Sequence, residues 1–408
     1  MKKTLLSLFL LMSALFLIAC GSSSDSGKNN SSSSAGSSSS ESGTGATADS
    51  IKIAGIFSAS GGAAALGEPE MQTLKMLVDQ KNAEGGINGQ QIELVTYDDK
   101  SDQNEAILAM KKALTQDKVS LVIGGTTSGN SLAMLPLAEQ NQVPYISVAA
   151  SKQIYVGEDG KARKWVFKMP QDDQQAVERI LQYLKDHNLS KVAWLNVANS
   201  YGTGGHDEFV KHAPKYGVEP VIEDEFETTV TDAKPLLTRV KKANPDVIIV
   251  WGTVQESAVV IKNIRELALD IPVLASHGIA TNQFIEVAGE AANDVILPTG
   301  KLLVANSLED SNPQKELLIA YNESYTAKYN KSASTFGAYA ADAFTIATKA
   351  IEAKGTDSAA LRDFIEQELG EFVGLTGTFN INAENHMGLS PDSFAMVRIV
   401  DGKWTLEN

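Results

Sequence analysis

The stretch "LVIGGTTSGNSLAMLPLAEQNQVPYISVAAS", residues 121–151, places two short apolar runs on either side of a segment with helical spacing. The runs "LVIGG" and "VPYISVA" are rich in β-branched residues, which favour strands, and residues 131–140 between them are expected to form a helix. Strand, helix and strand in this order predict a parallel crossover unit. Each predicted strand leads into a loop of small and hydroxyl-bearing residues.

The same alternation continues on both sides of this stretch. Before it, "IKIAGIF" and "QIELVTYD" are predicted strands; after it come "KVAWLNVA", "VEPVIEDEF", "DVIIVWG" and "IPVLASHG". Predicted helices lie near 70–83, 104–116, 176–186, 207–215, 234–243, 256–268, 313–329, 335–354 and from 358. Residues 375–388 and 394–407 are expected to form antiparallel strands. The fold class is therefore α/β, with two doubly wound, Rossmann-like lobes, and "WVFKMPQDD" with Pro170 is the expected hinge between them.

The N-terminus predicts a lipoprotein signal peptide over residues 1–20. Lys2 and Lys3 precede an apolar run that is too short for a membrane span and ends at Cys20, the sole cysteine. Cleavage before Cys20 and its acylation would tether the protein to the cell surface. The alternative is an uncleaved anchor with an incidental thiol. A single cysteine excludes an internal disulfide and a cysteine metal site.

Residues 21–50 are dominated by Ser and Gly and predict a flexible tether, with a reach of about 30 Å. The rest of the chain has enough length for two domains. The formal net charge of −15, without any basic patch, argues against nucleic-acid binding. We interpret the acidity as a contribution to solubility.

The two loops of the opening stretch favour an anion. Helix N-termini present unpaired N–H groups and a positive dipole end, and Thr127 and Ser128 add hydroxyl donors. Ser151 and the backbone near Ala149 would reach the same place from the next strand. Because neither loop carries Lys or Arg, a carboxylate is favoured over a phosphate. The alternative is that these hydroxyls serve only as helix caps.

The segments "IKIAGIFSASGGAAALG", "NAEGGINGQQIELVTYDD", "LVIGGTTSGNSLAM", "VPYISVAAS" and "NSYGTGG" resemble the leucine/isoleucine/valine-binding proteins of ABC transporters, a family of type I periplasmic binding proteins. The resemblance extends over residues 51–408. It implies two Rossmann-like lobes that close on a small carboxylate and deliver it to a membrane permease. We assign residues 51–170 and 302–377 to lobe 1, and residues 171–301 and 378–408 to lobe 2.

The resemblance also implies the ligand-binding residues. By position they are Ser128 and Thr127 on the ligand carboxylate, backbone groups of Ala149 and Ala150, Ser151 where threonine is common, and Tyr201 covering the ligand on closure. Leu66 stands where the family often has a tyrosine, which makes that wall more apolar. The implied partners are a small carboxylate, an ABC permease and the membrane through the lipid anchor. We expect an extracytoplasmic monomer without cofactor or metal.

One departure from the family concerns the ligand amino group. His277 stands at the position where the family has the acidic residue that binds the ligand ammonium. An amino-acid ligand is therefore in doubt. The segments "ASHGIA", "ILPTGKLLVA" and "DSNPQK" are similar to a branch that binds aromatic or other organic carboxylates. A neutral histidine can donate to a ligand oxygen, and histidine ordinarily titrates near neutral pH. The alternative is a loop histidine with a purely structural role.

The predicted function is that of a substrate-binding lipoprotein of an ABC importer, and not of an enzyme. The chain has no GxSxG elbow, no HExxH motif and no cysteine in the body of the chain. Two other functions stay open from sequence alone. They are a ligand sensor that signals through a receptor, and a hydrolase that uses the serines of the cleft.

Overall fold

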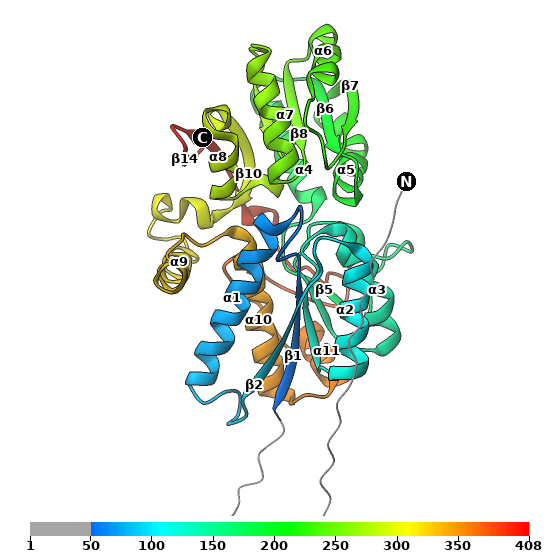
Figure 1. Ribbon diagram of the computed structural model, residues 1–408, viewed down its shortest axis with the longest axis vertical. Coiled ribbons are helices and arrows are strands. Elements are labelled where there is room, and N and C mark those ends of the chain that lie inside the picture. The colour runs from blue at the N-terminus through cyan, green and yellow to red at the C-terminus, as the bar shows by residue number, and fades with distance from the viewer. Residues whose placement is uncertain (1–49, 408) are drawn as a thin grey trace, which may run out of the picture. The chain divides into compact units, whose positions relative to one another are not determined.

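A computed structural model describes residues 50–407, which form two large β-sheets flanked by helices and one small two-stranded sheet (Figure 1). The predicted signal peptide, Cys20 and all of the predicted tether except Ser50 lie outside the described residues. Over residues 50–407, no helix has both the length and the apolar character needed to cross a bilayer.

The first sheet is parallel throughout and has the strand order β2-β1-β3-β4-β5. Its strands are β1 (Ile51–Phe57), β2 (Ile92–Asp98), β3 (Leu121–Gly124), β4 (Tyr145–Ser147) and β5 (Val166–Lys168). Helices α1 (Ala64–Ala83), α2 (Gln103–Lys112) and α3 (Ser128–Asn141) connect them. Two later helices, α10 (Thr335–Lys354) and α11 (Ser358–Gln367), join this sheet, and α10 lies beside α1 (Figure 1). We call this assembly the first lobe.

The second sheet has the order β14-β13-β10-β9-β8-β6-β7. The parallel strands are β6 (Lys191–Val197), β7 (Glu219–Phe226), β8 (Val247–Trp251), β9 (Val273–Ala275) and β10 (Val295–Gly300); β13 (Phe394–Val400) and β14 (Lys403–Leu406) add an antiparallel edge. Its helices are α4 (Asp173–Asp186), α5 (Ser200–Tyr216), α6 (Lys234–Ala243), α7 (Val254–Glu266) and α8 (Asn282–Ala288). We call this assembly the second lobe. Helix α9 (Lys315–Tyr329) and the short pair β11 (Phe372–Val373) and β12 (Thr378–Phe379) complete the α-helices and strands of the described residues, which also form short 3₁₀ and π turns.

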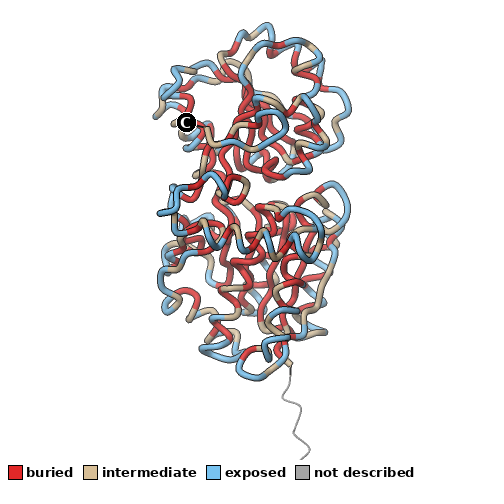
Figure 2. Tube along the Cα trace, turned by 90° about the vertical axis from the view of Figure 1, so that its left-hand side faces the viewer, coloured by how far each residue is buried: buried red, intermediate tan, exposed pale blue. Residues whose placement is uncertain are grey.

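The inner parallel strands of both sheets are buried, as expected for sheets covered by helices (Figure 2), whereas the edge strands β2 and β7 are partly exposed. In the second lobe Trp194 and Trp251 are fully buried, with ring centroids 5.4 Å apart. Trp194 also stacks on Phe209 of α5 at 4.4 Å. Both tryptophans therefore belong to the core.

The chain passes between the lobes more than once, and the crossing segments are bound to one another. After β5, residues 169–172 lead into α4, and the Gln171 amide donates to the carbonyls of Thr376 and Ser393 at 3.3 Å each. Those carbonyls lie in the segment that runs from the first lobe to β13. The lobe boundaries at residues 170, 301 and 377 stay predictions.

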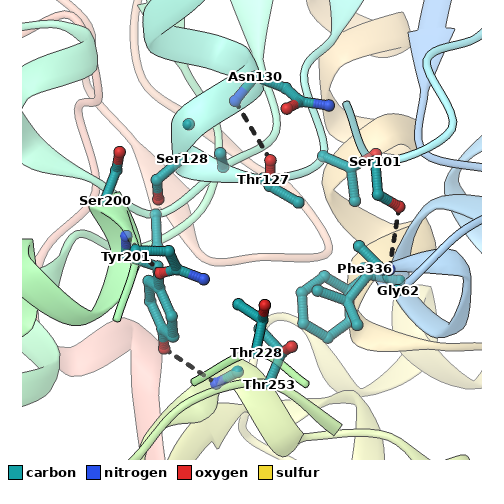
Figure 3. A pocket seen from close by; sticks show the side chains of 18 of the residues that line it. Gly62, Ser101, Thr127, Ser128, Asn130, Ser200, Tyr201, Thr228, Thr253 and Phe336 are labelled. Carbon is teal, nitrogen blue, oxygen red and sulfur yellow. Dashed lines mark hydrogen bonds between the residues drawn. The ribbon is translucent and has the colours of Figure 1, made fainter. Parts of the chain in front are cut away.

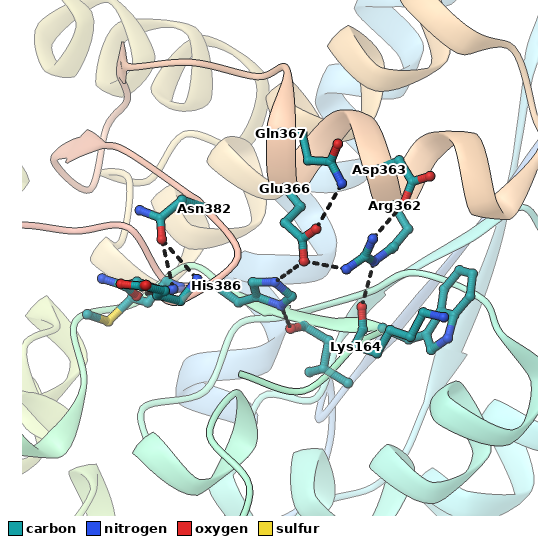
Figure 4. A network of polar contacts seen from close by, with 12 residues as sticks. Lys164, Arg362, Asp363, Glu366, Gln367, Asn382 and His386 are labelled. Atoms are coloured by element: carbon teal, nitrogen blue, oxygen red, sulfur yellow. Dashed lines mark hydrogen bonds and ion pairs between the residues drawn. The ribbon is translucent and has the colours of Figure 1, made fainter. Parts of the chain in front are cut away.

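His386 fixes the loop before β13 to the first lobe (Figure 4). Its Nδ1 lies 2.9 Å from the Val166 carbonyl, its Nε2 lies 3.1 Å from Glu366 Oε1, and its ring stacks on Phe167 at 4.4 Å. Arg362 of α11 also pairs with Glu366. The network joins β5, α11 and the C-terminal loop, so it holds the ends of two crossings in place.

Candidate functional site

A cavity of about 490 Å³ lies where the carboxyl ends of the strands of both sheets meet (Figure 3). The loops that line it follow β1, β2, β3 and β4 in the first lobe, and β6, β7, β8 and β9 in the second. This is the position at which open α/β sheets bind ligands, because loops there lead into helix N-termini. Of the predicted site residues, the wall includes Thr127, Ser128, Ala149, Ala150, Tyr201 and His277.

Thr127 and Ser128 form the start of α3 in the first lobe. The Thr127 hydroxyl accepts from the Asn130 N–H at 3.2 Å, so Thr127 is the N-cap and the capping interpretation holds for it. The Ser128 hydroxyl oxygen accepts from the Ser151 N–H at 3.3 Å, which leaves the Ser128 proton available to a ligand. The helix was expected from residue 131 but begins at Ser128, because the cap and the fold outweigh the low helix propensity of Gly and Ser.

The loop after β4 contributes backbone groups. The Ala149 N–H donates to Ser147 Oγ at 3.2 Å, whereas the Ala150 N–H has no partner among the described residues. Ser151 is not part of the cavity wall. Its hydroxyl accepts from the Gln153 N–H and caps a short 3₁₀ turn, Lys152–Ile154.

Tyr201 and His277 form the facing wall in the second lobe. The Tyr201 hydroxyl oxygen accepts from the Gly278 N–H at 3.1 Å, and it lies 3.5 Å from His277 Nδ1. His277 accepts the tyrosine proton at Nδ1 in the tautomer that carries its own proton on Nε2. His277 is only 2% exposed, and its Nε2 has no hydrogen-bond partner among the described residues. In the tautomer that carries its proton on Nε2, His277 offers a donor beside the cavity.

Burial sets the charge of His277. The loss of solvation, together with the nearby charge of Lys168, lowers the pKa of His277 to about 3. The ring is accordingly neutral at physiological pH. The expectation that it titrates near neutral pH is wrong, because the loop carries it into the interior instead of leaving it in solvent.

Sequence reasoning placed the apolar Leu66 in the cavity wall but missed the aromatic residues that α10 adds to it. Phe336 and Tyr339 of α10 line it, with ring centroids 5.6 Å apart, and Leu66, Val148 and Pro170 extend the same surface. The sequence signal for these residues was the spacing of three between Phe336 and Tyr339 at the start of a predicted helix. Only the tertiary packing of α10 on α1 shows that this face meets the cavity.

Two carboxylates in the wall were also missed. Asp102 caps α2 by accepting from the N–H groups of Asn104 and Glu105 at 2.8 and 3.0 Å. Glu256 completes a capping box on α7, with Oε1 2.7 Å from both the N–H and the hydroxyl of Thr253. Each carboxylate thus has one oxygen bound at a helix terminus. Over residues 50–407 no cluster of His, Cys, Asp or Glu is arranged to hold a metal ion.

Comparison with known proteins identifies the family. A sequence profile of the periplasmic binding proteins matches residues 50–403. The chain belongs to this family. Among related binding proteins, the Leu/Ile/Val-binding protein homolog 2 of Brucella abortus is 26% identical over 335 residues, which cover 81% of this chain and 86% of the relative. A leucine-, isoleucine-, valine-, threonine- and alanine-binding protein of Pseudomonas aeruginosa is 25% identical over 312 residues, 76% of this chain and 79% of the relative.

Solved structures share the two-lobed architecture of this binding protein. An extracellular ligand-binding receptor of Rhodopseudomonas palustris superimposes with a TM-score of 0.82 at 25% identity, over 88% of this chain and all of that one. A branched-chain amino acid transporter substrate-binding protein of Streptococcus pneumoniae was solved with isoleucine. It superimposes with a TM-score of 0.76 at 28% identity, over 87% of this chain and 98% of that one. The predicted family and fold are confirmed. The protein is an extracytoplasmic binding protein of the branched-chain amino acid type, the class that serves ABC transporters.

Proposed function

We propose that this protein is the substrate-binding lipoprotein of an ABC importer, that it binds a small carboxylic acid in the interlobe cavity, and that it delivers the acid to a permease. The observation that carries the proposal is the set of uncommitted donors around one cavity, two from the first lobe and one from the second. They are the Ser128 hydroxyl, the Ala150 N–H and His277 Nε2.

The donors of the first lobe suit a carboxylate. Ser128 and Ala150 lie at the carboxyl ends of adjacent strands, β3 and β4, and the unpaired N–H groups at the start of α3 add the positive end of the helix dipole. A hydrogen bond to a charged group contributes about 1.5–3 kcal/mol. Three or four such bonds with modest apolar burial reach the roughly 8 kcal/mol of a micromolar site.

The donors of the second lobe favour a ligand without an α-amino group. A neutral His277 that offers Nε2–H has no attraction for an ammonium, and a buried ammonium without a counter-ion costs several kcal/mol. Asp102 and Glu256 are the carboxylates of the wall, and both already accept helix N–H groups. Phe336 and Tyr339 add an apolar surface for the ligand side group. These features together support an aromatic or other organic acid over the matching amino acid.

A thermal-shift panel tests the proposal. It compares aromatic acids, keto acids and aliphatic acids with branched-chain amino acids, and includes the corresponding amides as uncharged controls. Ligand at a hundredfold excess over Kd adds about 2.7 kcal/mol to the stability of the folded state, which is readily visible. Stabilisation by acids but not by their amides supports the carboxylate grip. Stabilisation by amides to the same extent would contradict it.

Delivery to a permease and attachment through Cys20 are the remaining parts of the proposal. The family membership and the extracytoplasmic class support them. Removal of the protein from its cell should abolish high-affinity uptake of the acid identified in the panel. Uptake that persists unchanged, with loss of a transcriptional or chemotactic response instead, would favour the sensor function.

A further inference from the structure

Two oppositely charged side chains lie at the ends of the first segment that crosses between the lobes. Lys168 is the last residue of β5 in the first lobe, and Asp173 is the first residue of α4 in the second. Both are buried, with exposures of 0% and 1%. Residues 169–172 separate them, and Pro170 in this segment lines the ligand cavity.

The carboxylate of Asp173 has no hydrogen-bond partner for either oxygen among the described residues. It lies against α5 in the second lobe, where a Cβ on Gly204 would come within 2.6 Å of Asp173 Oδ2, so the glycine makes room for the carboxylate. Ser151 Oγ of the first lobe lies 3.8 Å from the same point. The carboxylate therefore sits where the two lobes meet.

Lys168 is similarly short of partners. Its ammonium donates to the Pro170 carbonyl at 2.5 Å, and its other polar neighbour is Met387 Sδ at 3.8 Å. An ammonium has three N–H groups, so the Pro170 carbonyl satisfies only part of its capacity. Lys168 and Asp173 interact electrostatically but are not in ion-pair contact. Burial raises the pKa of Asp173 and lowers the pKa of Lys168.

The other charged groups near Asp173 leave Lys168 as its partner. Asp172 already accepts from the Tyr155 hydroxyl and from the Gln175 N–H, both at 2.9 Å. Glu208 of α5 repels Asp173, and His277, near Lys168, is neutral. Of the described groups that act on the Asp173 carboxylate, only Lys168 is positively charged.

A buried carboxylate without a partner is costly, whereas a paired and hydrogen-bonded one is tolerated. Rotation about the backbone of residues 169–172 changes the separation of the two side chains, because each is attached to a different lobe. We propose that Lys168 and Asp173 form a split charge pair that is apart in the arrangement described here and in contact in a second arrangement of the lobes. The pair then sets the balance between the two arrangements, independently of which ligand the cavity takes.

Spin–spin distances between the lobes test this inference without a ligand. Nitroxide labels at positions 116 and 242, in place of the exposed Gln116 and Lys242, report on the first and second lobe in the full chain with Cys20→Ser. Pulsed electron paramagnetic resonance then compares the labelled parent with Asp173→Asn, Lys168→Met and the double variant. Thermal unfolding of each variant confirms that it is folded.

The parent is expected to show two separations, one of which matches the structure described here. Each single variant should raise the population of the arrangement described here, relative to the second arrangement, by roughly tenfold. The reason is that either substitution abolishes the contact between Lys168 and Asp173 in the second arrangement. The double variant should shift it no further. A parent with a single separation, variants indistinguishable from the parent, or shifts that add in the double variant would each overturn the inference. If a single variant fails to fold, the double variant, which carries neither charge, replaces it in the comparison with the parent.

Discussion

At the scale of single residues, the site is defined by polar atoms that the protein leaves without partners. Ser128 accepts one hydrogen bond and keeps its own proton, and His277 has its Nδ1 beside Tyr201 and its Nε2 free. Buried polar groups in folded proteins are nearly always paired. Unpaired donors in a cavity wall therefore indicate the groups that a ligand is expected to satisfy.

The Ser128→Ala variant should weaken binding of the acid ligand by about 1–3 kcal/mol, the cost of leaving a charged acceptor short of one donor. Isothermal calorimetry measures the change. The matched control is Ser151→Ala, because Ser151 lies outside the cavity wall and its loss should leave affinity almost unchanged. An unchanged dissociation constant for Ser128→Ala would place the ligand elsewhere.

His277 should also shape the acid side of the stability profile. Its pKa is about 3 in the folded protein and near 6.5 when unfolded, so between these values the unfolded chain binds more protons. The stability that the neutral ring contributes is present above pH 6.5 and is lost as the pH falls towards 3.

Between pH 6.5 and 4.5 this loss amounts to about 2–3 kcal/mol. Chemical denaturation of the parent and of His277→Gln at these two pH values gives the comparison. When the pH falls from 6.5 to 4.5, the free energy of unfolding of the variant should decrease by about 2–3 kcal/mol less than that of the parent. Equal losses in the two proteins would show that His277 is already exposed to solvent when folded.

At the scale of elements, α10 links the cavity to a crossing segment. Its Phe336 and Tyr339 line the cavity, and its buried Asp342 accepts from the N–H groups of Leu375 and Thr376 at 2.8 and 2.7 Å. Burial raises the pKa of Asp342 to about 6. One helix thus holds both the apolar wall and the chain that leads back to the second lobe.

Removal of that carboxylate in Asp342→Ala should destabilise the protein by about 2–4 kcal/mol, because two buried N–H groups lose their acceptor. Urea denaturation measures it. The control is Glu352→Ala on the same helix, where an exposed ion pair with Lys81 contributes less than about 1 kcal/mol. Equal effects of the two substitutions would contradict the anchoring role of Asp342.

The strands were predicted from the sequence better than the helix starts. β1 has the predicted limits, the predicted strands that correspond to β2, β3, β4, β6, β7, β8 and β9 differ from the structure by one to three residues at their ends, and β10 was not predicted. Continuous runs of Val, Ile and Leu mark buried parallel strands clearly. By contrast α1, α3 and α5 begin three to seven residues before the predicted positions. Their first turns contain Gly, Ser and Asn, which have low helix propensity but suit helix N-termini and the loops that bind ligands.

The candidate site was predictable only where its residues lie at strand ends. The hydroxyls at Thr127 and Ser128 follow β3 directly, so local pattern indicated them. Phe336 and Tyr339 come from a helix more than 200 residues later, and no local pattern relates them to β3. Residues 375–388 were expected to form a strand, but only β12 is regular there, because this segment is a crossing held by side chains such as Asp342 and His386.

At the scale of the whole molecule, the sequence predicts a tethered binding protein. The described body has two lobes around a cavity, and the predicted lipid site at Cys20 is separated from it by a Ser- and Gly-rich stretch. Such a tether lets the body move close to the membrane without changing its binding site. Anchoring and ligand affinity should therefore be independent properties.

The Cys20→Ser variant should release the mature body from membranes and leave ligand affinity unchanged. Fractionation followed by immunoblotting gives the distribution, and calorimetry gives the affinity. A variant that stays with the membrane fraction as the parent does would disprove the lipoprotein prediction.

The central claim is that the cavity recognises a carboxylate without an α-amino group, and the most direct measurement is a pair of calorimetric titrations. Leucine is compared with its keto acid, and phenylalanine with phenylpyruvate, against the parent, His277→Glu and Glu256→Gln. The parent should bind a deaminated acid more tightly than the matching amino acid, and His277→Glu should reverse part of that preference by supplying an anion. Glu256→Gln keeps an acceptor for the α7 cap and should leave the preference unchanged. A parent that binds leucine or phenylalanine at least tenfold more tightly than any deaminated analogue would contradict the account.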